Sequence, residues 1–373
     1  MDFAPFELEH MQSIWEQQVD FNLTESGVHP IRLDELLAGD PDKLAELLAT
    51  EINYPHVNGI PELRHNIAQL YDDADVGNVL VTVGAAEANN LVMQTLMEPG
   101  DELATQAPTY KQVWGLASNA GHVVRPFHMS ADSGWALDID DLNAQVRTNT
   151  RIVALCNPNN PTGYILTEAE MDAVVAAADR VGAWILADEV YRGAERLRQD
   201  ETPSFFGRYD KVVALGSMSK AYGLPGLRVG WVVGPPDTVE DLWRRHEYTT
   251  ITASMISNLL AAYALSAEVR PRLIERTRSY IRNGFPVLEG WMQQQGGLFS
   301  YTPPQASAVS FVRYHLDINS TELMEALCRQ ASVFVGAGDA FGIDYHLRIA
   351  FGQEELVLNE AFARIQKTLE SLV

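Results

Sequence analysis

The sequence predicts an α/β protein with a mostly parallel sheet of seven strands covered by helices, followed by a smaller α/β unit. Two observations predict this class. Between residue 79 and about residue 235, short apolar runs alternate with helix-like stretches, and the runs have no polar face. Such alternation is typical of parallel sheets that are covered on both sides. The chain has 373 residues, 46% of them hydrophobic, which is enough for a large core.

The elements follow one another in order. The expected strands are NVLVTVG (78–84), DELATQAP (101–108), HVVRPFHM (122–129), RIVALCN (151–157), AWILADEV (183–190), KVVALGSMS (211–219) and LRVGWVVG (227–234). The stretch 167–182 is an expected helix, because Met171, Val174, Val175 and Ala178 repeat at helical spacing and TEAE offers a capping box. After residue 235 the pattern is long and helical. The chain then closes with strand-like SAVSFVRYHL (307–316) and YHLRIAFG (345–352) and a last helix, 353–373, whereas its first 40 residues fit neither pattern.

Composition excludes several classes of function. The chain carries 50 acidic and 27 basic residues, a net charge of −23, which argues against nucleic acid or an anionic membrane as a partner. Its two cysteines, Cys156 and Cys328, are too few for a disulfide framework or a zinc cluster and fit a reducing cytoplasm. The N-terminal segment lacks the pattern of a signal peptide, and no apolar run approaches the roughly 20 residues of a membrane span. We therefore expect a cytoplasmic protein without a metal site.

Residues with chemical potential gather where the predicted strands end, which is where ligand sites lie in such sheets. The segments are GAAEA (84–88), NPNNPTG (157–163), ADEVY (187–191) and SMSK (217–220). Lys220, held among small residues, is a candidate nucleophile that can form an imine with an aldehyde. Asp188 ends an apolar strand and needs a cationic partner, which a protonated pyridine nitrogen would supply. Tyr191 and Asn160 could reach a ring hydroxyl.

The remaining features indicate binding of an anion and of an aromatic ring. GAAEA at a helix start presents backbone N–H groups to an anion such as phosphate, which Ser217 and Arg228 could complete. Tyr110 could stack on the ring. Each feature alone has an ordinary structural explanation, such as a surface lysine, a helix-capping aspartate or a core tyrosine. Their order and spacing together favour one site.

The motifs NPNNPTG, ADEVY and SMSKAYGLPGLRVGW resemble those of the class I/II aminotransferases, the fold-type-I pyridoxal-phosphate enzymes, and the resemblance covers nearly the whole chain. It implies that pyridoxal 5′-phosphate is the cofactor. It implies that Lys220 holds the cofactor as an internal aldimine and shuttles a proton, that Asp188 pairs with the ring nitrogen, and that Asn160 and Tyr191 bind the ring oxygen O3′. It also implies phosphate binding by Ala85, Ala86, Ser217 and Arg228, and ring stacking by Tyr110.

Two further positions concern the substrate and a partner subunit. Arg348 in HLRIAFG matches the arginine that grips the substrate α-carboxylate. Tyr54 matches a tyrosine that reaches the phosphate of the neighbouring subunit, which implies a homodimer with shared active sites. We expect a large cofactor-binding domain over residues 40–275 and a small domain made of residues 1–39 and 276–373.

The expected reaction is transfer of an amino group from an amino acid to a 2-oxo acid, because the Asp188–Lys220 pair suits proton abstraction and Arg348 suits a free α-carboxylate. Fold alone does not settle the reaction. A non-enzymatic binding protein of this fold would be expected to have lost Lys220, Asp188 or Arg348, and all three are present.

One segment favours a different reaction. NLTESGVHPIRLDELL departs from the usual family N-terminus and, with RRHEYTTITASMIS, is similar to the capreomycidine synthases, which remove a β-hydroxyl from hydroxylated arginine and close a ring. This would place Glu25, Ser26 and His29 near the substrate, with Glu25 facing a cationic side chain and His29 acting as acid or base. Alternatively, Glu25 caps a turn and His29 packs beside a proline. Residues 249–252 are either a substrate-side loop or a helix start.

Overall fold

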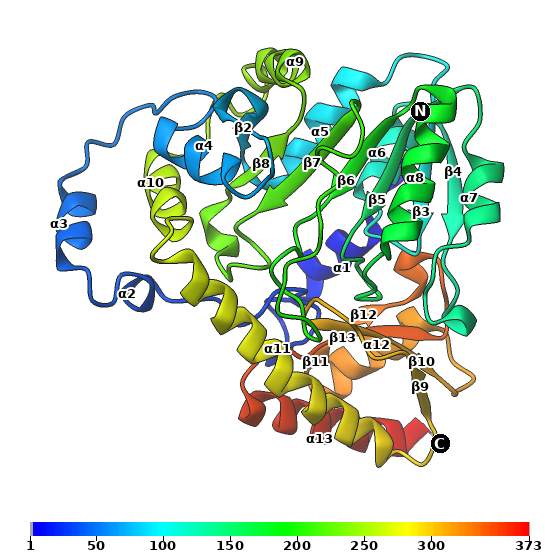
Figure 1. Cartoon of the computed structure of the whole chain (residues 1–373). Coiled ribbons are helices and arrows are strands. Elements are labelled where there is room, and N and C mark those ends of the chain that lie inside the picture. Colours follow the sequence, from blue (N-terminus) through cyan, green and yellow to red (C-terminus); the bar gives the residue numbers. More distant parts are fainter. Residues whose placement is uncertain (1–2, 373) are drawn as a thin grey trace.

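The computed structural model describes residues 3–372, and a seven-stranded sheet with the order β2-β8-β7-β6-β5-β3-β4 forms its centre (Figure 1). The strands of this sheet are β2 (Val79–Thr82), β3 (Glu102–Ala107), β4 (Val123–His128), β5 (Thr150–Cys156), β6 (Trp184–Asp188), β7 (Val212–Ser217) and β8 (Gly230–Val233). Strand β8 runs antiparallel to both of its neighbours, and every other neighbouring pair is parallel. The predicted mostly parallel, seven-stranded sheet is confirmed.

Helices surround this sheet and continue into the C-terminal part of the chain (Figure 1). They are α1 (Glu7–Trp15), α2 (Leu33–Leu36), α3 (Pro41–Ala49), α4 (Pro61–Ala68), α5 (Gly84–Leu96), α6 (Gln112–Asn119), α7 (Ile139–Gln145), α8 (Glu168–Val181), α9 (Pro236–His246), α10 (Met255–Ala264), α11 (Arg270–Gln293), α12 (Ser320–Ala326) and α13 (Glu355–Leu372).

The central strands are apolar on both faces because both faces are covered. Along β5, Ile152 and Ala154 point into a cluster shared with α5, α6 and α9. Val153 and Leu155 point to the opposite face, into a cluster shared with α7 and α8. This alternation has the period of two residues that a strand imposes, and it produces a helix–sheet–helix arrangement.

Helix α8 illustrates how local sequence fixes an element. The Thr167 hydroxyl accepts a hydrogen bond from the Glu170 backbone N–H, while the Glu170 carboxylate accepts one from the Thr167 N–H. This is the predicted capping box. The helix ends at Gly182, whose positive φ of 69° suits a residue without a side chain.

A second sheet lies in the C-terminal part of the chain, with the order β12-β13-β10-β9 and antiparallel neighbours throughout. Its strands are β9 (Phe299–Tyr301), β10 (Val309–Tyr314), β12 (Gly336–Ala337) and β13 (His346–Ala350). The N-terminal β1 (Phe21–Asn22) pairs in parallel with β11 (Val333–Phe334), so the start of the chain joins this unit. The domain limits at residues 40 and 275 remain a prediction.

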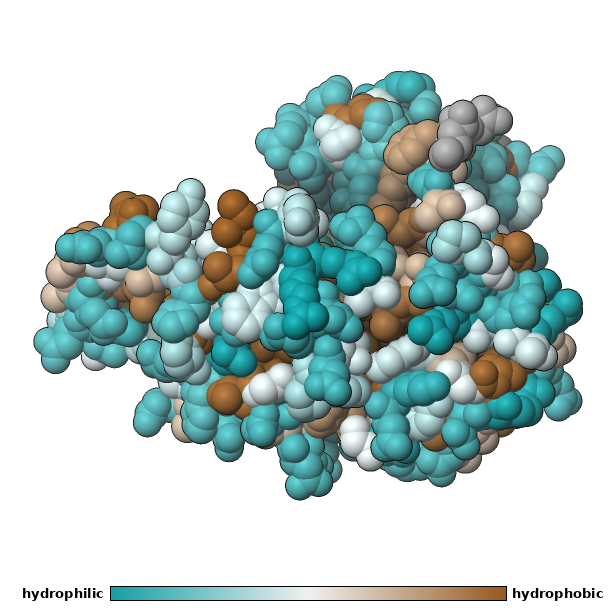
Figure 2. Space-filling model, turned by 90° about the horizontal axis from the view of Figure 1, so that it is seen from above, coloured by the Kyte–Doolittle hydropathy of each residue, from teal (hydrophilic) through white to brown (hydrophobic). Residues whose placement is uncertain are grey.

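Helices α2 and α3 and the residues after them form an arm that projects from the body (Figure 1, left). Leu44, Leu48, Ile52 and Tyr54 of this arm are exposed. In Figure 2, hydrophobic side chains lie among hydrophilic ones on the projecting lobe. Several large exposed apolar side chains on one projecting segment are typical of an association surface. Over residues 3–372, no helix is both long and apolar enough to span a bilayer.

Candidate active site

A cavity of about 330 Å³ opens at the carboxyl ends of β5, β6 and β7. The residues that the sequence predicts for the site and that line this cavity are Glu25, Ser26, Ala85, Ala86, Tyr110, Asn160, Asp188, Tyr191, Ser217, Lys220, Arg228 and Arg348. They come from widely separated parts of the sequence.

The strand register explains why these residues meet. In the parallel pairs, Cys156 lies opposite Asp188 and Asp188 lies opposite Leu215, so the three strands end at one edge. Strand β7 ends at Ser217, and Lys220 follows within the next turn of chain. The edge therefore collects the polar residues that follow each strand.

The N-terminus of α5 forms the anion-binding end of the cavity. Gly84 begins the helix with a φ of 75°, and a Cβ there would lie 2.5 Å from Nη2 of Arg228. A Cβ on Gly230 would lie 2.4 Å from the Gly84 carbonyl carbon. The two glycines thus let Arg228 and β8 approach the free N–H groups of the first helical turn, where the helix dipole is positive. With Ser217 at the same wall, this cradle fits a phosphate group.

Lys220 and Asp188 face the cavity with shifted proton affinities. Burial lowers the pKa of Lys220, an effect that Arg348 and Arg228 strengthen and that the carboxylates of Glu25 and Glu9 oppose. Burial raises the pKa of Asp188 to about 6. The hydrogen bond from the backbone N–H of residue 190 and the charge of Lys220 act in the opposite direction and lower this pKa. A lysine that loses its proton readily suits imine formation, and a desolvated carboxylate seeks a cationic partner such as a protonated ring nitrogen.

Arg348 forms a second anion receptor in the cavity wall. It is 2% exposed, its Nη1 donates to Asn160 Oδ1 at 3.0 Å, and its Nη2 donates to the Thr24 carbonyl oxygen at 2.7 Å. Its Nε has no hydrogen-bond partner among residues 3–372. Burial lowers its pKa, which Tyr191 and Glu25 counteract. A buried guanidinium with an unused donor fits a carboxylate ligand.

Tyr191 and Asn160 also line the cavity. The Tyr191 hydroxyl donates to Ser26 Oγ at 2.8 Å, and burial raises the pKa of Tyr191 well above its ordinary value. Asn160 is also buried and accepts from Arg348 through Oδ1, which leaves its amide nitrogen to donate. Both side chains can therefore contact the oxygen atoms of a bound ring.

Helix α1 supplies cavity residues that sequence reasoning missed, Glu9 and Gln12. The Tyr110 hydroxyl donates to Glu9 Oε1 at 2.7 Å, and the rings of Phe6 and Tyr110 meet edge to face with centroids 4.8 Å apart. No pattern in the sequence indicated them, because the first 40 residues fit neither the strand nor the helix pattern.

Two predicted residues do not line the cavity of their own chain. His29 is exposed, and its Nδ1 lies 3.2 Å from Gln353 Oε1. Tyr54 is 82% exposed on the projecting arm. Residues 249–252 form a loop rather than a helix start, because α10 begins at Met255. The hydroxyls of Thr249 and Thr250 in this loop donate to Glu87 on α5.

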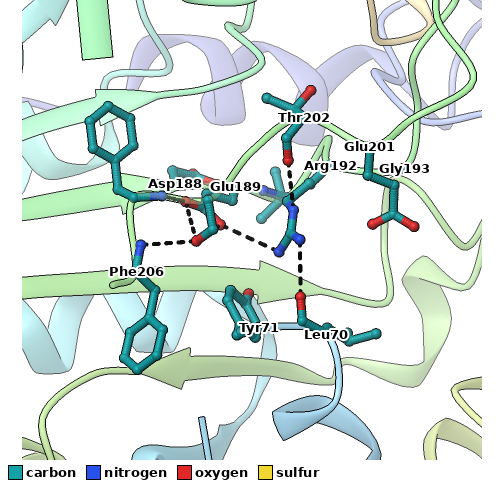
Figure 3. A network of polar contacts seen from close by, with 12 residues as sticks. Leu70, Tyr71, Asp188, Glu189, Arg192, Gly193, Glu201, Thr202 and Phe206 are labelled. Carbon is teal, nitrogen blue, oxygen red and sulfur yellow. Dashed lines mark hydrogen bonds and ion pairs between the residues drawn. The ribbon is translucent and has the colours of Figure 1, made fainter. Parts of the chain in front are cut away.

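A buried charge network supports the strand end that carries Asp188 (Figure 3). Glu189 accepts hydrogen bonds from the Phe205 backbone N–H and the Ser204 hydroxyl, and Arg192 lies 3.9 Å from its carboxylate. Arg192 also donates to the carbonyl oxygens of residues 70 and 202 and lies over the Tyr71 ring. Burial raises the pKa of Glu189 to about 7, although Arg192 opposes this. The network fixes the turn from Asp188 to Tyr191 without reaching the cavity.

The chain is similar in sequence and in structure to known proteins. The family model described as aminotransferase class I and II matches residues 38–365. Capreomycidine synthase of Streptomyces vinaceus is 32% identical over 94% of this chain and 90% of that protein. Arginine–pyruvate transaminase of Pseudomonas aeruginosa is 29% identical over 88% of each chain. A crystal structure of a PLP-dependent aminotransferase from Streptococcus suis superposes with a TM-score of 0.93 at 29% identity, covering 100% of this chain and 99% of that one.

Proposed function

Because the chain belongs to the aminotransferase class I and II family, with pyridoxal phosphate as its cofactor, we propose that it transfers the amino group of an amino acid to a 2-oxo acid. One observation carries the proposal. Lys220, Asp188 and the carboxylate receptor Arg348 line a single cavity whose far end is an anion cradle. Such a site suits an amino acid held beside a phosphorylated aldehyde cofactor.

Each residue has a role that follows from its surroundings. When bound, pyridoxal phosphate supplies an electron sink that acidifies the proton on the substrate α-carbon. Lys220 would hold the cofactor covalently and, once released, move that proton, since burial lowers its pKa and so makes the neutral amine easier to form. Asp188 would keep the ring nitrogen protonated. Arg348 would orient the α-carboxylate by a two-pronged contact.

The remaining residues position the ring. The first turn of α5, from Ala85 and Ala86, would hold the phosphate together with Ser217 and Arg228. Tyr110 would stack on the ring, while Asn160 and Tyr191 would donate to its oxygen.

Product analysis tests the reaction. The purified protein with pyridoxal phosphate would be incubated with a panel of amino acids, including arginine and β-hydroxyarginine, with and without pyruvate or 2-oxoglutarate. We expect mass spectrometry to find a 2-oxo acid that accumulates catalytically only when an acceptor is present. Turnover of the amino acid without any acceptor would contradict aminotransfer.

A second candidate is an elimination or cyclisation enzyme that acts on a basic, arginine-like amino acid. It is favoured by the 32% identity to a capreomycidine synthase and by the carboxylate of Glu25 at the cavity wall. Both reactions begin with removal of the same α-proton, so the same residues serve either. In the product analysis above, loss of water from β-hydroxyarginine without an acceptor would identify this candidate.

We also propose that the protein is a homodimer with shared active sites and that it works in the cytoplasm. The exposed arm that carries Tyr54 supports the first proposal, because a partner subunit would cover its apolar side chains. The unpaired thiols of Cys156 and Cys328, both buried, agree with a reducing compartment.

A further inference from the structure

We propose that Glu9 and Glu25 form a two-carboxylate subsite that binds a cationic group, a guanidinium or an ammonium, on the side chain of the amino acid substrate. This rests on the proposed function, in that the substrate is an amino acid bound beside pyridoxal phosphate. It adds Glu9, on α1, to the residues that would select the substrate, whichever reaction follows.

The first argument is the position of the two carboxylates. Glu9 and Glu25 line the same cavity as Lys220 and Arg348, and both are exposed toward it rather than packed in the core. Neither makes an ion pair within 4.0 Å among residues 3–372. The hydrogen bond that Glu9 receives comes from the neutral Tyr110 hydroxyl and brings no opposite charge into contact with it.

The second argument is the charge of the occupied site. When pyridoxal phosphate is bound, Arg228 would hold its phosphate, Asp188 would pair with its ring nitrogen, and Lys220 would hold it covalently. Arg348 would bind the substrate carboxylate. Glu9 and Glu25 would then be the cavity carboxylates not engaged by cofactor or substrate carboxylate, and a cationic side-chain group could pair with them.

The third argument is that the cavity wall carries two poles of opposite charge, a positive one at Arg348 and a negative one at Glu9 and Glu25. Arg348 is nine-tenths buried or more and keeps an unpartnered Nε in the wall, which by itself indicates an anionic ligand group. The carboxylates of Glu9 and Glu25 indicate a cationic group on the same ligand. An amino acid with a positively charged side chain carries both groups, whereas one with a neutral side chain satisfies only the first pole.

Helix α1 holds Glu9 in place at the cavity. Phe6 packs edge to face on Tyr110, the Tyr110 hydroxyl donates to Glu9, and Gln12 Nε2 donates to Thr24 Oγ1 at 3.1 Å. The Thr24 carbonyl oxygen in turn accepts a hydrogen bond from Arg348. The helix is thus tied both to the residue expected to stack on the cofactor and to the carboxylate receptor, so the distance between the two poles is set by the fold.

The test measures binding rather than turnover. The holoenzyme would be titrated with L-arginine and with L-citrulline, which has nearly the same shape but a neutral side chain, following the change in cofactor absorbance. We expect wild-type protein to bind arginine at least about tenfold more tightly, as one charge-assisted contact allows. E9Q and E25Q should each reduce this preference, and the double variant should remove most of it. Glu7→Gln, which removes a charge from the same helix but does not line the cavity, should leave it unchanged.

Three outcomes would overturn the inference while leaving the proposed function intact: equal binding of arginine and citrulline by wild-type protein, an unchanged preference in E9Q, or an equal loss in E7Q. The cofactor spectrum of each variant before titration shows whether the site has remained intact. If no amino acid in a wider panel, including neutral and acidic ones, changed the wild-type spectrum, the proposed function would fail instead.

Discussion

At the scale of single residues, the cavity concentrates groups that would be costly without a ligand. The carboxylate of Asp188 has a raised pKa, Lys220 a lowered one, and Arg348 an unused donor. Residues with such perturbed properties cluster at functional sites because catalysis and ligand binding offset their cost.

Lys220→Ala should abolish the covalent link to the cofactor and reduce turnover by about 10²–10⁴-fold, because no other lysine lines the described cavity to remove the α-proton. Borohydride reduction followed by peptide mass spectrometry should find the modified lysine in wild-type protein only. Lys367→Ala, at an exposed position of α13, is the control and should behave as wild type. Normal turnover of K220A would refute the assigned role.

The raised pKa of the buried Glu189 carboxyl should make the stability of the protein depend on pH. Its pKa is about 7 in the native protein, where burial raises it, and its ordinary value is 4.5. Between these values the native state holds a proton that the unfolded chain has lost, so the free energy of unfolding falls as the pH rises from about 4.5 to 7. The variant E189Q should lack this contribution. Urea midpoints of both proteins at pH 5 and pH 7.5 would measure it, and parallel changes in the two proteins would show that Glu189 does not titrate in this range.

At the scale of elements, the strands and α8 follow from local sequence, and so do the site residues directly after each strand. Asp188 and Lys220 could be predicted because the parallel strands bring their ends to one edge. Glu9 could not, because its position depends on tertiary packing. The pairing of Phe21 with Val333 and the contact of Glu9 with Tyr110 each join residues about 100 or more positions apart, which no local pattern reveals.

The packing of helix α11 depends on a close contact between Gly284 and the backbone of Phe351. A Cβ at Gly284 would lie 1.9 Å from the Phe351 carbonyl oxygen, whereas a Cβ at Gly290 on the same helix meets nothing within 4 Å. Gly284→Ala should therefore destabilise the protein by roughly 1–3 kcal/mol through overpacking. Gly290→Ala should stabilise it by roughly 0.5–1 kcal/mol, because alanine is the better helix former. Equal urea midpoints for the two variants would contradict the close packing of α11 against residue 351.

At the scale of the whole molecule, the arm formed by α2 and α3 is the part least explained by a single chain (Figure 1). Its apolar side chains are exposed, and Tyr54, which the family resemblance assigns to a phosphate site, lies away from the cavity of its own chain. The proposed second subunit would account for both observations, because it would cover the arm and receive Tyr54. Helix α1, by contrast, contributes Glu9 and Gln12 to the cavity of its own chain.

Mixing two variants, each impaired at a different residue, tests shared sites directly. If Tyr54 serves the neighbouring subunit, a heterodimer of K220A and Tyr54→Ala contains one site with both residues intact and one site lacking both. Random exchange of subunits in an equal mixture should then restore about a quarter of wild-type activity, since half of the dimers are mixed and half of their sites are intact. The assay would use limiting pyridoxal phosphate, where loss of a phosphate contact matters most. If Tyr54 acted within its own chain, every site in the mixture would lack one residue or the other, and activity would stay at the level of the separate variants.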